Sequence, residues 1–468
     1  MKASSLRIAR ITGRRHDPCD LAARLNGDLA LPYPFHLGWF LQGSSVQAWG
    51  EPWTGNIGQE WMQPDLFVDM ARALERACFD YILLEDSSYV GEAYGGSREI
   101  YLKNGLSVPR QDPSVVATLL FAATKRIGVC TTLATFTHHP YLLARIIASL
   151  DQVSAGRAGW NMVTGSSDMA ARNYGLDGLP EHDLRYDMAD EYMACVNALW
   201  DSWEPGAIVA DREGGVLVDH TKVHTVDFKG KWYSSRGPLN SGPCVQGRPV
   251  IAQAGGSPRG RQFAATHGET IVANPKGIAA MKAYRDDVRA RAAAVGRDPD
   301  GIKVLFLVNP IIGESAEHAE MRRLERIANA DRKIVQRLAH FSKVTNIDFG
   351  SMDLDKPIDE TLRTNGHQQN LDTLKRLGAG GKTLRQAFTD YSGTGLSVDL
   401  CGTVDTIAGQ MAEAMQEVGG DGFLLSMGDV SRRVVAEVAD GLVPALQARG
   451  LVRRGYDHAT LRENLLAF

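Results

Sequence analysis

A turn that contains two glycines stands between an apolar run and a helical pattern at residues 253–261, which read Gln-Ala-Gly-Gly-Ser-Pro-Arg-Gly-Arg. Ser257 is a favourable N-cap residue, and Pro258 suits the first turn of a helix. Free backbone N–H groups at a helix start, glycines that permit a close approach and nearby guanidinium groups together suit a phosphate. The turn therefore predicts a phosphate site at Ser257, and a plain capped turn on the surface is the simpler alternative.

Two hydrogen-bonding side chains share one face of an expected helix further upstream. His182 and Tyr186 stand four residues apart in the segment 181–187, so both project from the same side of the helix. Such a pair is able to hold a polar ligand. A solvated histidine near the start of a surface helix is the more common situation, so the pair by itself leaves both interpretations open.

Further polar side chains follow two of the expected strands. Asp86 follows Glu85 just after the apolar run 81–84, and Thr132 ends the run 126–132. The carboxyl ends of parallel strands carry the active site in α/β barrels, which makes both residues candidates for a site. Asp86 precedes two serines, however, and is equally suited to capping a turn.

Two adjacent histidines, His138 and His139, precede Pro140. Neighbouring side chains of an extended segment point to opposite sides, and a third ligand at a suitable spacing is missing, so we expect no metal site here. His139 stays a candidate catalytic acid, base or hydrogen-bond donor.

The elements that must position these residues form an alternating pattern. Short apolar runs are each followed by a helical pattern, and the runs are residues 36–41, 81–84, 126–132, 158–163, 249–254, 269–272, 303–308 and 422–425. Strands that alternate with helices predict a parallel sheet, and eight such units are the number that closes it. We therefore predict an α/β fold of the TIM (β/α)8 barrel class with insertions, and an open doubly wound sheet is the alternative.

The chain of 468 residues is longer than the roughly 250 residues that a barrel needs. We expect an N-terminal arm at residues 1–34, one barrel domain at residues 35–450 and a C-terminal tail at residues 451–468. The excess falls into insertions at about 204–247 and 315–398. The first contains strand-like residues at 226–234, and the second opens with a helical pattern and continues as a polar stretch that suits a lid.

Composition narrows the partners and the compartment. The chain has 51 Lys and Arg against 55 Asp and Glu, which gives a net charge of −4 and argues against a nucleic-acid partner. Six scattered cysteines show no CxxC pair, so we expect a reducing cytoplasm and neither a disulfide framework nor a zinc site. Arg14 and Arg15 are not followed by the apolar segment of an export signal, and no run is long enough for a membrane span.

Several familiar catalytic motifs are missing from the chain. The nearest approach to GxGxxG is residues 393–395, which lack the third glycine and follow no expected strand. Walker, GxSxG and HExxH motifs are also absent. A Rossmann nicotinamide site, a P-loop NTPase, a serine hydrolase and a zincin are therefore unsupported.

The order of several segments resembles a known family. The segments are residues 79–86, 137–151, 156–164, 185–192 and 253–265. Together they resemble the luciferase-like flavin-dependent monooxygenases, in the branch of nitrilotriacetate monooxygenase component A and the dibenzothiophene sulfone and long-chain alkane monooxygenases. The resemblance extends from Phe35 to about Gly450.

This resemblance implies a TIM barrel that binds FMN at the carboxyl ends of its strands. Carried over residue by residue, Asp86 and Thr132 would meet the isoalloxazine side. His182 and Tyr186 would hydrogen-bond the flavin near its chain and phosphate, and Ser257 would bind the phosphate itself. These are the residues that their chemistry had already marked.

The resemblance also implies the reaction and the partners. Reduced FMN from a separate NAD(P)H-dependent flavin reductase would react with O2 to a C4a-hydroperoxide, which inserts one oxygen atom into a small organic substrate. The family further implies a homo-oligomer. A coenzyme F420-dependent oxidoreductase of the same superfamily and a noncatalytic flavin-binding protein are the alternatives.

One segment departs from the family pattern. Relatives often have Trp-Arg-His-Pro after the first strand, whereas residues 41–52 read Leu-Gln-Gly-Ser-Ser-Val-Gln-Ala-Trp-Gly-Glu-Pro here. Because this loop would face the substrate, the resemblance leaves the substrate open.

Overall fold

The computed structural model describes residues 34–41, 63–393, 396–428 and 430–468. The arm expected at residues 1–34 and the divergent loop at residues 41–52 lie outside the described residues, apart from Pro34 and Leu41.

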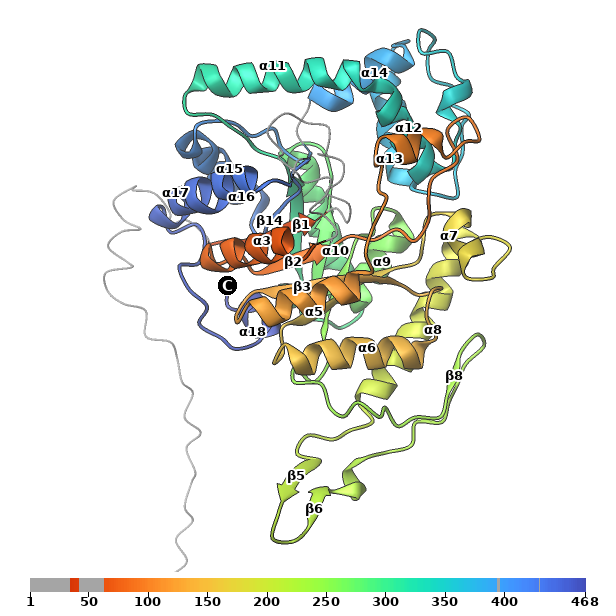
Figure 1. The fold of residues 1–468 in the computed structure, drawn as a ribbon, viewed down its shortest axis with the longest axis vertical. Helices are drawn as coiled ribbons and strands as arrows, with labels where there is room; N and C mark the ends of the chain where they lie inside the picture. The colour runs from red at the N-terminus through yellow and green to blue at the C-terminus, as the bar shows by residue number, and fades with distance from the viewer. Residues whose placement is uncertain (1–33, 42–62, 394–395, 429) are drawn as a thin grey trace, which may run out of the picture.

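Eight parallel strands close into a barrel (Figure 1). In their order around the barrel they are β1 (His36–Leu41), β2 (Tyr81–Leu84), β3 (Gly128–Ala134), β4 (Ala158–Val163), β9 (Val250–Gln253), β10 (Thr270–Ala273), β11 (Lys303–Val308) and β14 (Gly422–Leu425). The last of them, β14, pairs with β1 and completes the ring. The predicted TIM barrel is confirmed, and the alternative of an open sheet is wrong.

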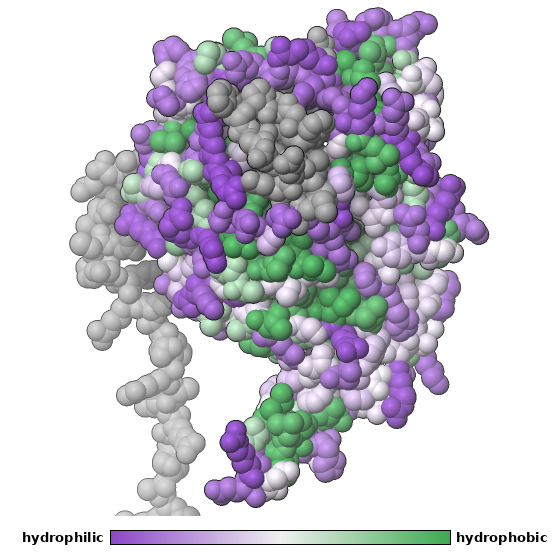
Figure 2. Space-filling view, viewed as in Figure 1, coloured by the Kyte–Doolittle hydropathy of each residue, from purple (hydrophilic) through white to green (hydrophobic). Residues whose placement is uncertain are grey.

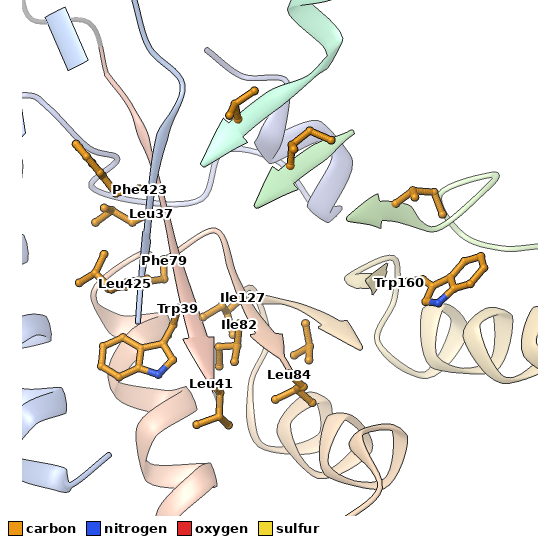
Figure 3. Close-up of a cluster of buried hydrophobic side chains, with 14 of the residues drawn as sticks. Leu37, Trp39, Leu41, Phe79, Ile82, Leu84, Ile127, Trp160, Phe423 and Leu425 are labelled. Atoms are coloured by element: carbon orange, nitrogen blue, oxygen red, sulfur yellow. The ribbon is translucent and has the colours of Figure 1, made fainter. Parts of the chain in front are cut away.

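The strands are largely apolar because both of their faces are buried, as is usual in parallel sheets, and Asn161 on β4 and Gln253 on β9 are among the polar exceptions. One set of side chains fills the barrel interior, where the Tyr81 hydroxyl lies 2.8 Å from that of Thr270. The other set packs against the surrounding helices, and Figure 3 shows Trp39 and Trp160 among these outward side chains.

A ring of helices covers the strands. Its members are α3 (Asp65–Arg76), α5 (Pro113–Ala123), α6 (Pro140–Val153), α8 (His182–Trp200), α9 (Pro258–His267), α10 (Ile278–Ala294), α15 (Val404–Val418), α16 (Arg432–Ala436) and α17 (Val443–Ala448), with a π-helical turn at Glu437–Leu442. Shorter helices are α4 (Glu99–Lys103) and α7 (Asp168–Asn173), and 3-10 turns lie at His220–Lys222, Pro299–Gly301 and Phe349–Ser351. Among the described helices, none has the length and apolar character that crossing a membrane requires.

The first insertion consists of two small antiparallel hairpins. Strands β5 (Ile208–Asp211) and β6 (Val216–Val218) form one, which extends away from the barrel in Figure 1. Strands β7 (Phe228–Lys229) and β8 (Ser234–Ser235) form the other, which overlaps the strand-like residues that the sequence indicated. The projecting hairpin exposes apolar side chains, which appear green in Figure 2.

The second insertion is a helical subassembly with its own small core (Figure 1). It contains α11 (Ala316–Arg332), α12 (Ile334–Thr345), α13 (Gln368–Gly378) and α14 (Leu384–Gly393), between the short strands β12 (Ile311–Ile312) and β13 (Cys401–Gly402). The sequence pattern predicted only the opening helix. Helices α13 and α14 were missed because their buried residues, such as Leu374 and Phe388, are few among polar neighbours.

The C-terminal residues close the amino end of the barrel. Arg453 donates to the buried carboxylate of Asp80 over 2.7 Å, and the same carboxylate lies 3.0 Å from His36 Nδ1. The ring of Phe468 stacks on His36, and the helix α18 (Leu461–Leu465) packs Leu461 into the barrel core. The opposite, carboxyl end of the strands is the one that the helical insertion overlies.

Candidate active site at the carboxyl ends of the barrel strands

The turn between β9 and α9 forms a tight backbone cradle. The Ser257 hydroxyl accepts a hydrogen bond from the backbone N–H of Gly260 at 3.0 Å and so caps α9, as the sequence predicted. Gly255 has no room for a side chain, because a Cβ there would lie 2.5 Å from the carbonyl of Gly260. The Tyr284 hydroxyl holds the turn by donating to the Gly255 carbonyl at 2.6 Å.

Helix α8 brings two further side chains to this cradle. The His182 Nε2 atom lies 3.4 Å from the Ser257 hydroxyl. The Tyr186 hydroxyl lies so close to Gly260 that a Cβ on that glycine would approach it to 2.8 Å. The i, i+4 spacing on α8 thus aims both side chains at the start of α9. The structure brings together Ser257, His182 and Tyr186, three of the residues that the sequence singled out.

The arginines of the turn were expected to assist a phosphate, but both form ion pairs with carboxylates. Arg259 donates to Asp187 at 3.0 Å and to Asp190 at 2.5 Å. Arg261 donates to Asp287 at 2.8 Å. Both guanidinium groups are therefore held by carboxylates of neighbouring helices. The helix start, Ser257 and the imidazole nearby are left as the groups that would attract an anion.

Thr132 lies on β3, which is separated from β9 by β4 alone. Its hydroxyl accepts a hydrogen bond at 2.8 Å from Nδ2 of Asn161, which lies on the neighbouring strand β4. The other amide atom, Asn161 Oδ1, is buried and has no partner among the residues that the structure describes. A buried polar group that lacks a partner is costly, so this amide offers a ligand in the mouth an unused hydrogen-bonding position.

Asp86 follows β2 and lies beside a charged pair. Arg110 Nη1 is 2.9 Å from Glu85 Oε2 and 3.7 Å from Asp86 Oδ1. Burial raises the pKa of the Asp86 carboxyl to about 6, and the nearby Arg110 charge limits the increase. Strands β2 and β3 are neighbours, so Asp86 and Thr132 emerge at the same edge of the mouth.

The exposed imidazole of His139 has a local structural contact. Its Nδ1 atom accepts from the backbone N–H of Tyr141 at 3.2 Å and caps α6. This hydrogen bond occupies the Nδ1 atom of the ring. The catalytic role of His139 stays a prediction.

The helical insertion spans the mouth and is fastened on both sides. On one side, Lys343 Nζ of α12 donates to the Ser87 hydroxyl at 2.8 Å. On the other, Arg185 Nη1 of α8 donates to Asn365 Oδ1 at 3.1 Å. We call α12 and residues 364–367 the roof. Gly366 packs tightly within it, since a Cβ there would lie 2.6 Å from the Val344 carbonyl.

Three residues of this region escaped the sequence analysis: Asn161, Arg110 and Lys343. A polar residue inside an otherwise apolar strand was a usable signal for Asn161. Arg110 and Lys343 had no local signal, because only the tertiary fold places them beside the residues that follow β2.

The residues present fit a phosphate-bearing flavin better than a metal. A cradle bounded by Gly255 and Gly260 and by the start of α9 suits an anionic tail. Thr132 and the Asn161 Oδ1 atom, which has no partner among the described residues, suit a polar ring system in the mouth. Among the described residues, no group of three or more His, Cys, Asp or Glu side chains is arranged to hold a metal ion.

Comparison with known proteins agrees with this geometry. The sequence model of the family described as luciferase-like monooxygenase matches residues 38–422. The chain is 35% identical over 436 residues to a dibenzothiophene-sulfone monooxygenase of Rhodococcus erythropolis, covering 92% of this chain and 95% of that one. It is 32% identical over 440 residues to nitrilotriacetate monooxygenase component A of Aminobacter aminovorans, covering 92% and 96%.

A solved structure is also similar over nearly the whole length. A riboflavin lyase, determined with modified FMN and the substrate riboflavin, superimposes with a TM-score of 0.83 at 32% identity and covers 93% of this chain and 96% of that one. The family match covers most of the chain, and the relatives are similar from end to end. The chain belongs to the luciferase-like monooxygenase family.

Proposed function

We propose that this protein is an FMN-dependent monooxygenase that takes reduced FMN from a separate NAD(P)H-dependent flavin reductase and inserts one oxygen atom of O2 into a small organic substrate. The observation that carries the proposal is the convergence of Ser257, His182 and Tyr186 on the start of α9, at the mouth of the barrel. This is the arrangement that an anionic cofactor tail requires.

The residues divide into three groups along the cofactor. Ser257 and the N–H groups at the start of α9 hold the phosphate, while His182 and Tyr186 hydrogen-bond the chain next to it. Asp86 and Thr132 meet the isoalloxazine side. When bound, the reduced flavin supplies the electrons that activate O2, and the protein supplies orientation and surroundings.

Asp86 has a definite protonation state in this proposal. With a pKa of about 6, its carboxyl is mainly ionised at neutral pH. An ionised carboxylate only accepts hydrogen bonds, so Asp86 holds an N–H group of its ligand. Protonation in mild acid removes one of these acceptor positions.

The roof serves to exclude water from the site. Its contacts with Ser87 on one side and with α8 on the other hold it across the mouth. A closed mouth keeps water from the reacting groups and strengthens polar interactions inside it.

The relatives support this reading. The name of the nitrilotriacetate enzyme, component A, denotes a protein that works with another component, and we propose a flavin reductase as the partner here. The similar riboflavin lyase was solved with a modified FMN. We further propose that the protein is a homo-oligomer, which light scattering of the purified chain tests.

The cofactor is tested by anaerobic titration. Reduced FMN and reduced coenzyme F420 are added separately to the purified protein, and binding is followed by absorbance. We expect binding of reduced FMN and none of reduced F420. Preferential binding of F420 would contradict the proposal and support the deazaflavin alternative.

The reaction is tested with labelled oxygen. Candidate sulfones, sulfides, alkanes and amino-polycarboxylates are incubated with the protein, a flavin reductase, NADH, FMN and 18O2, and products are read by mass spectrometry. We expect one 18O atom in the product and none when only water carries the label. Tight binding of oxidised FMN without any oxygenated product would favour a noncatalytic flavin-binding protein.

A further inference from the structure

The roof carries a buried ammonium group that contacts no carboxylate in the part of the chain that the structure describes. Lys343 is only 4% exposed. Its Nζ atom donates to the Ser87 hydroxyl at 2.8 Å and lies 4.9 Å from the centre of the Tyr89 ring. Within the described part of the chain, no carboxylate oxygen lies within 4.0 Å of this nitrogen. Lysine is seldom buried unless it is paired, so the position calls for an anion.

Two histidines of the roof mark a recess beside this lysine. His340 is partly accessible and His367 is exposed. Nevertheless, desolvation lowers the pKa of His340 to about 4 and also lowers the pKa of His367, with the Lys343 charge contributing to both. His340 stands three residues before Lys343 on α12, and the backbone N–H of His367 donates to the Val344 carbonyl at 2.9 Å. Both imidazoles therefore belong to the part of the roof that carries Lys343, and we call the surroundings of these three side chains the recess. Both imidazoles are neutral there at pH 7.

Charges of both signs face the recess. From the barrel side it is faced by Glu85 and Asp86, but Arg110 already pairs with the Glu85 carboxylate at 2.9 Å. From the roof and α8 it is faced by Lys343, Arg337 and Arg185.

The guanidinium of Arg185 is buried as well. It donates to the Asn365 side chain and to the backbone carbonyls of Pro180 and Asn365, all of which are neutral acceptors. A second buried cation that contacts no carboxylate of the described residues strengthens the attraction that the recess exerts on an anion.

We propose that the recess under the roof binds an anionic group of the organic substrate, a carboxylate or sulfonate, with Lys343 as its charged partner and His340 and His367 as hydrogen-bonding partners. The inference rests on the proposed function only in taking this anion to belong to the substrate. Lys343 is then a residue that determines specificity, because its positive charge attracts the anion of an acid more strongly than the corresponding neutral amide.

The test compares two probes of the same shape. Benzoate and benzamide are titrated into the protein without flavin by calorimetry, in Tris and in triethanolamine buffer at pH 7.0 and pH 8.5. We expect benzoate to bind at least tenfold more tightly than benzamide at pH 7.0. Because the pKa of Lys343 is about 8, an anion that raises it must cause proton uptake at pH 8.5, which appears as a difference in heat between the two buffers.

Three variants separate charge from structure. Lys343→Met keeps the length of the side chain and removes the charge, so it should lose the benzoate preference at least tenfold, whereas Lys343→Arg should retain it. Lys382→Met is the matched control, because this exposed lysine of the same insertion pairs with Asp390 at 2.7 Å. It should bind benzoate as the unchanged protein does.

A crystallographic experiment tests the inference even if benzoate does not fit the recess. Crystals soaked in sodium bromide should show an anomalous bromide peak beside Lys343 Nζ, and Lys343→Met crystals should lack it. Equal binding of benzoate and benzamide together with an empty bromide map would overturn the inference.

Benzoate that competes with FMN would also overturn the inference, since the anion would then belong to the flavin site. Failure of this inference can be told apart from failure of the proposed function. A protein that binds FMN normally but does not bind benzoate contradicts only the inference, and a protein that binds benzoate but not FMN contradicts only the proposed function.

Discussion

Replacement of Ser257 by aspartate should weaken FMN binding through charge alone. Both serine and aspartate are good N-cap residues, so the substituted carboxylate can still accept the Gly260 N–H that Ser257 now accepts at 3.0 Å. The helix start, and with it the barrel, should therefore remain intact. What changes is that a negative charge stands where we place the phosphate.

The magnitude follows from Coulomb's law. Two unit charges about 5 Å apart interact by about 3 kcal/mol at an effective dielectric constant of about 20. The phosphate carries between one and two charges, and salt in the buffer screens part of the repulsion. We expect a loss of about 3 kcal/mol, which is roughly a hundredfold weaker dissociation constant.

The assay is quenching of flavin fluorescence in titrations with FMN and with riboflavin, which lacks the phosphate. Ser257→Asp should weaken FMN about a hundredfold and leave riboflavin nearly unchanged. Ser257→Asn, which keeps a neutral cap, should change FMN affinity only slightly. Unchanged FMN affinity, or an equal loss for FMN and riboflavin, would refute the assignment of the phosphate to this turn.

Three further predictions address other parts of the molecule. Tyr186→Phe should weaken FMN by about 1 kcal/mol, the usual worth of one hydrogen bond, with unchanged circular dichroism; no loss in an FMN titration would exclude this hydroxyl from the site. Burial raises the pKa of Asp86 to about 6, so FMN affinity should fall as the pH drops through that value and Asp86→Asn should flatten the profile; an unaltered profile in the variant would show that another group titrates. Arg453→Met leaves the carboxylate of Asp80 without its 2.7 Å partner and should lower the free energy of unfolding by about 3 kcal/mol; urea unfolding at neutral pH measures this, and a change below about 1 kcal/mol would mean that His36 suffices as a partner.

Much of the barrel could be predicted because its strands obey a simple rule. Burial on both faces demands continuous apolar runs, and such runs stood out between helical patterns. Five of the eight strands have the expected bounds, as at Lys303–Val308, and the other three differ by one or two residues at each end, as at Gly128–Ala134. Strand ends are set by pairing with neighbours, which the local pattern does not contain.

The cradle was predictable for a similar reason. The N-cap Ser257, the glycines before it and the i, i+4 spacing of His182 and Tyr186 are local features with local causes. Their convergence required only that α8 and α9 cover adjacent strands of the barrel, which the order of the βα units supplies.

The rest of the site depends on contacts between distant segments. Lys343 meets Ser87 across 256 positions of sequence, and nothing near either residue signals the other. Arg259 was expected to assist a phosphate, but carboxylates of α8 hold it. A charged residue in a motif can thus serve the packing of its neighbours, and only the tertiary structure decides between these roles.

The most direct test of the central claim is a crystal structure of the protein with FMN. We predict the phosphate within hydrogen-bond distance of the Ser257 hydroxyl and the N–H groups at the start of α9, with the ring system in the mouth beside Asp86 and Thr132. A cavity of about 470 Å³ at the amino end of the barrel, lined by Arg285 and Lys303, offers a different place. Flavin found there, or a phosphate remote from Ser257, would contradict the account.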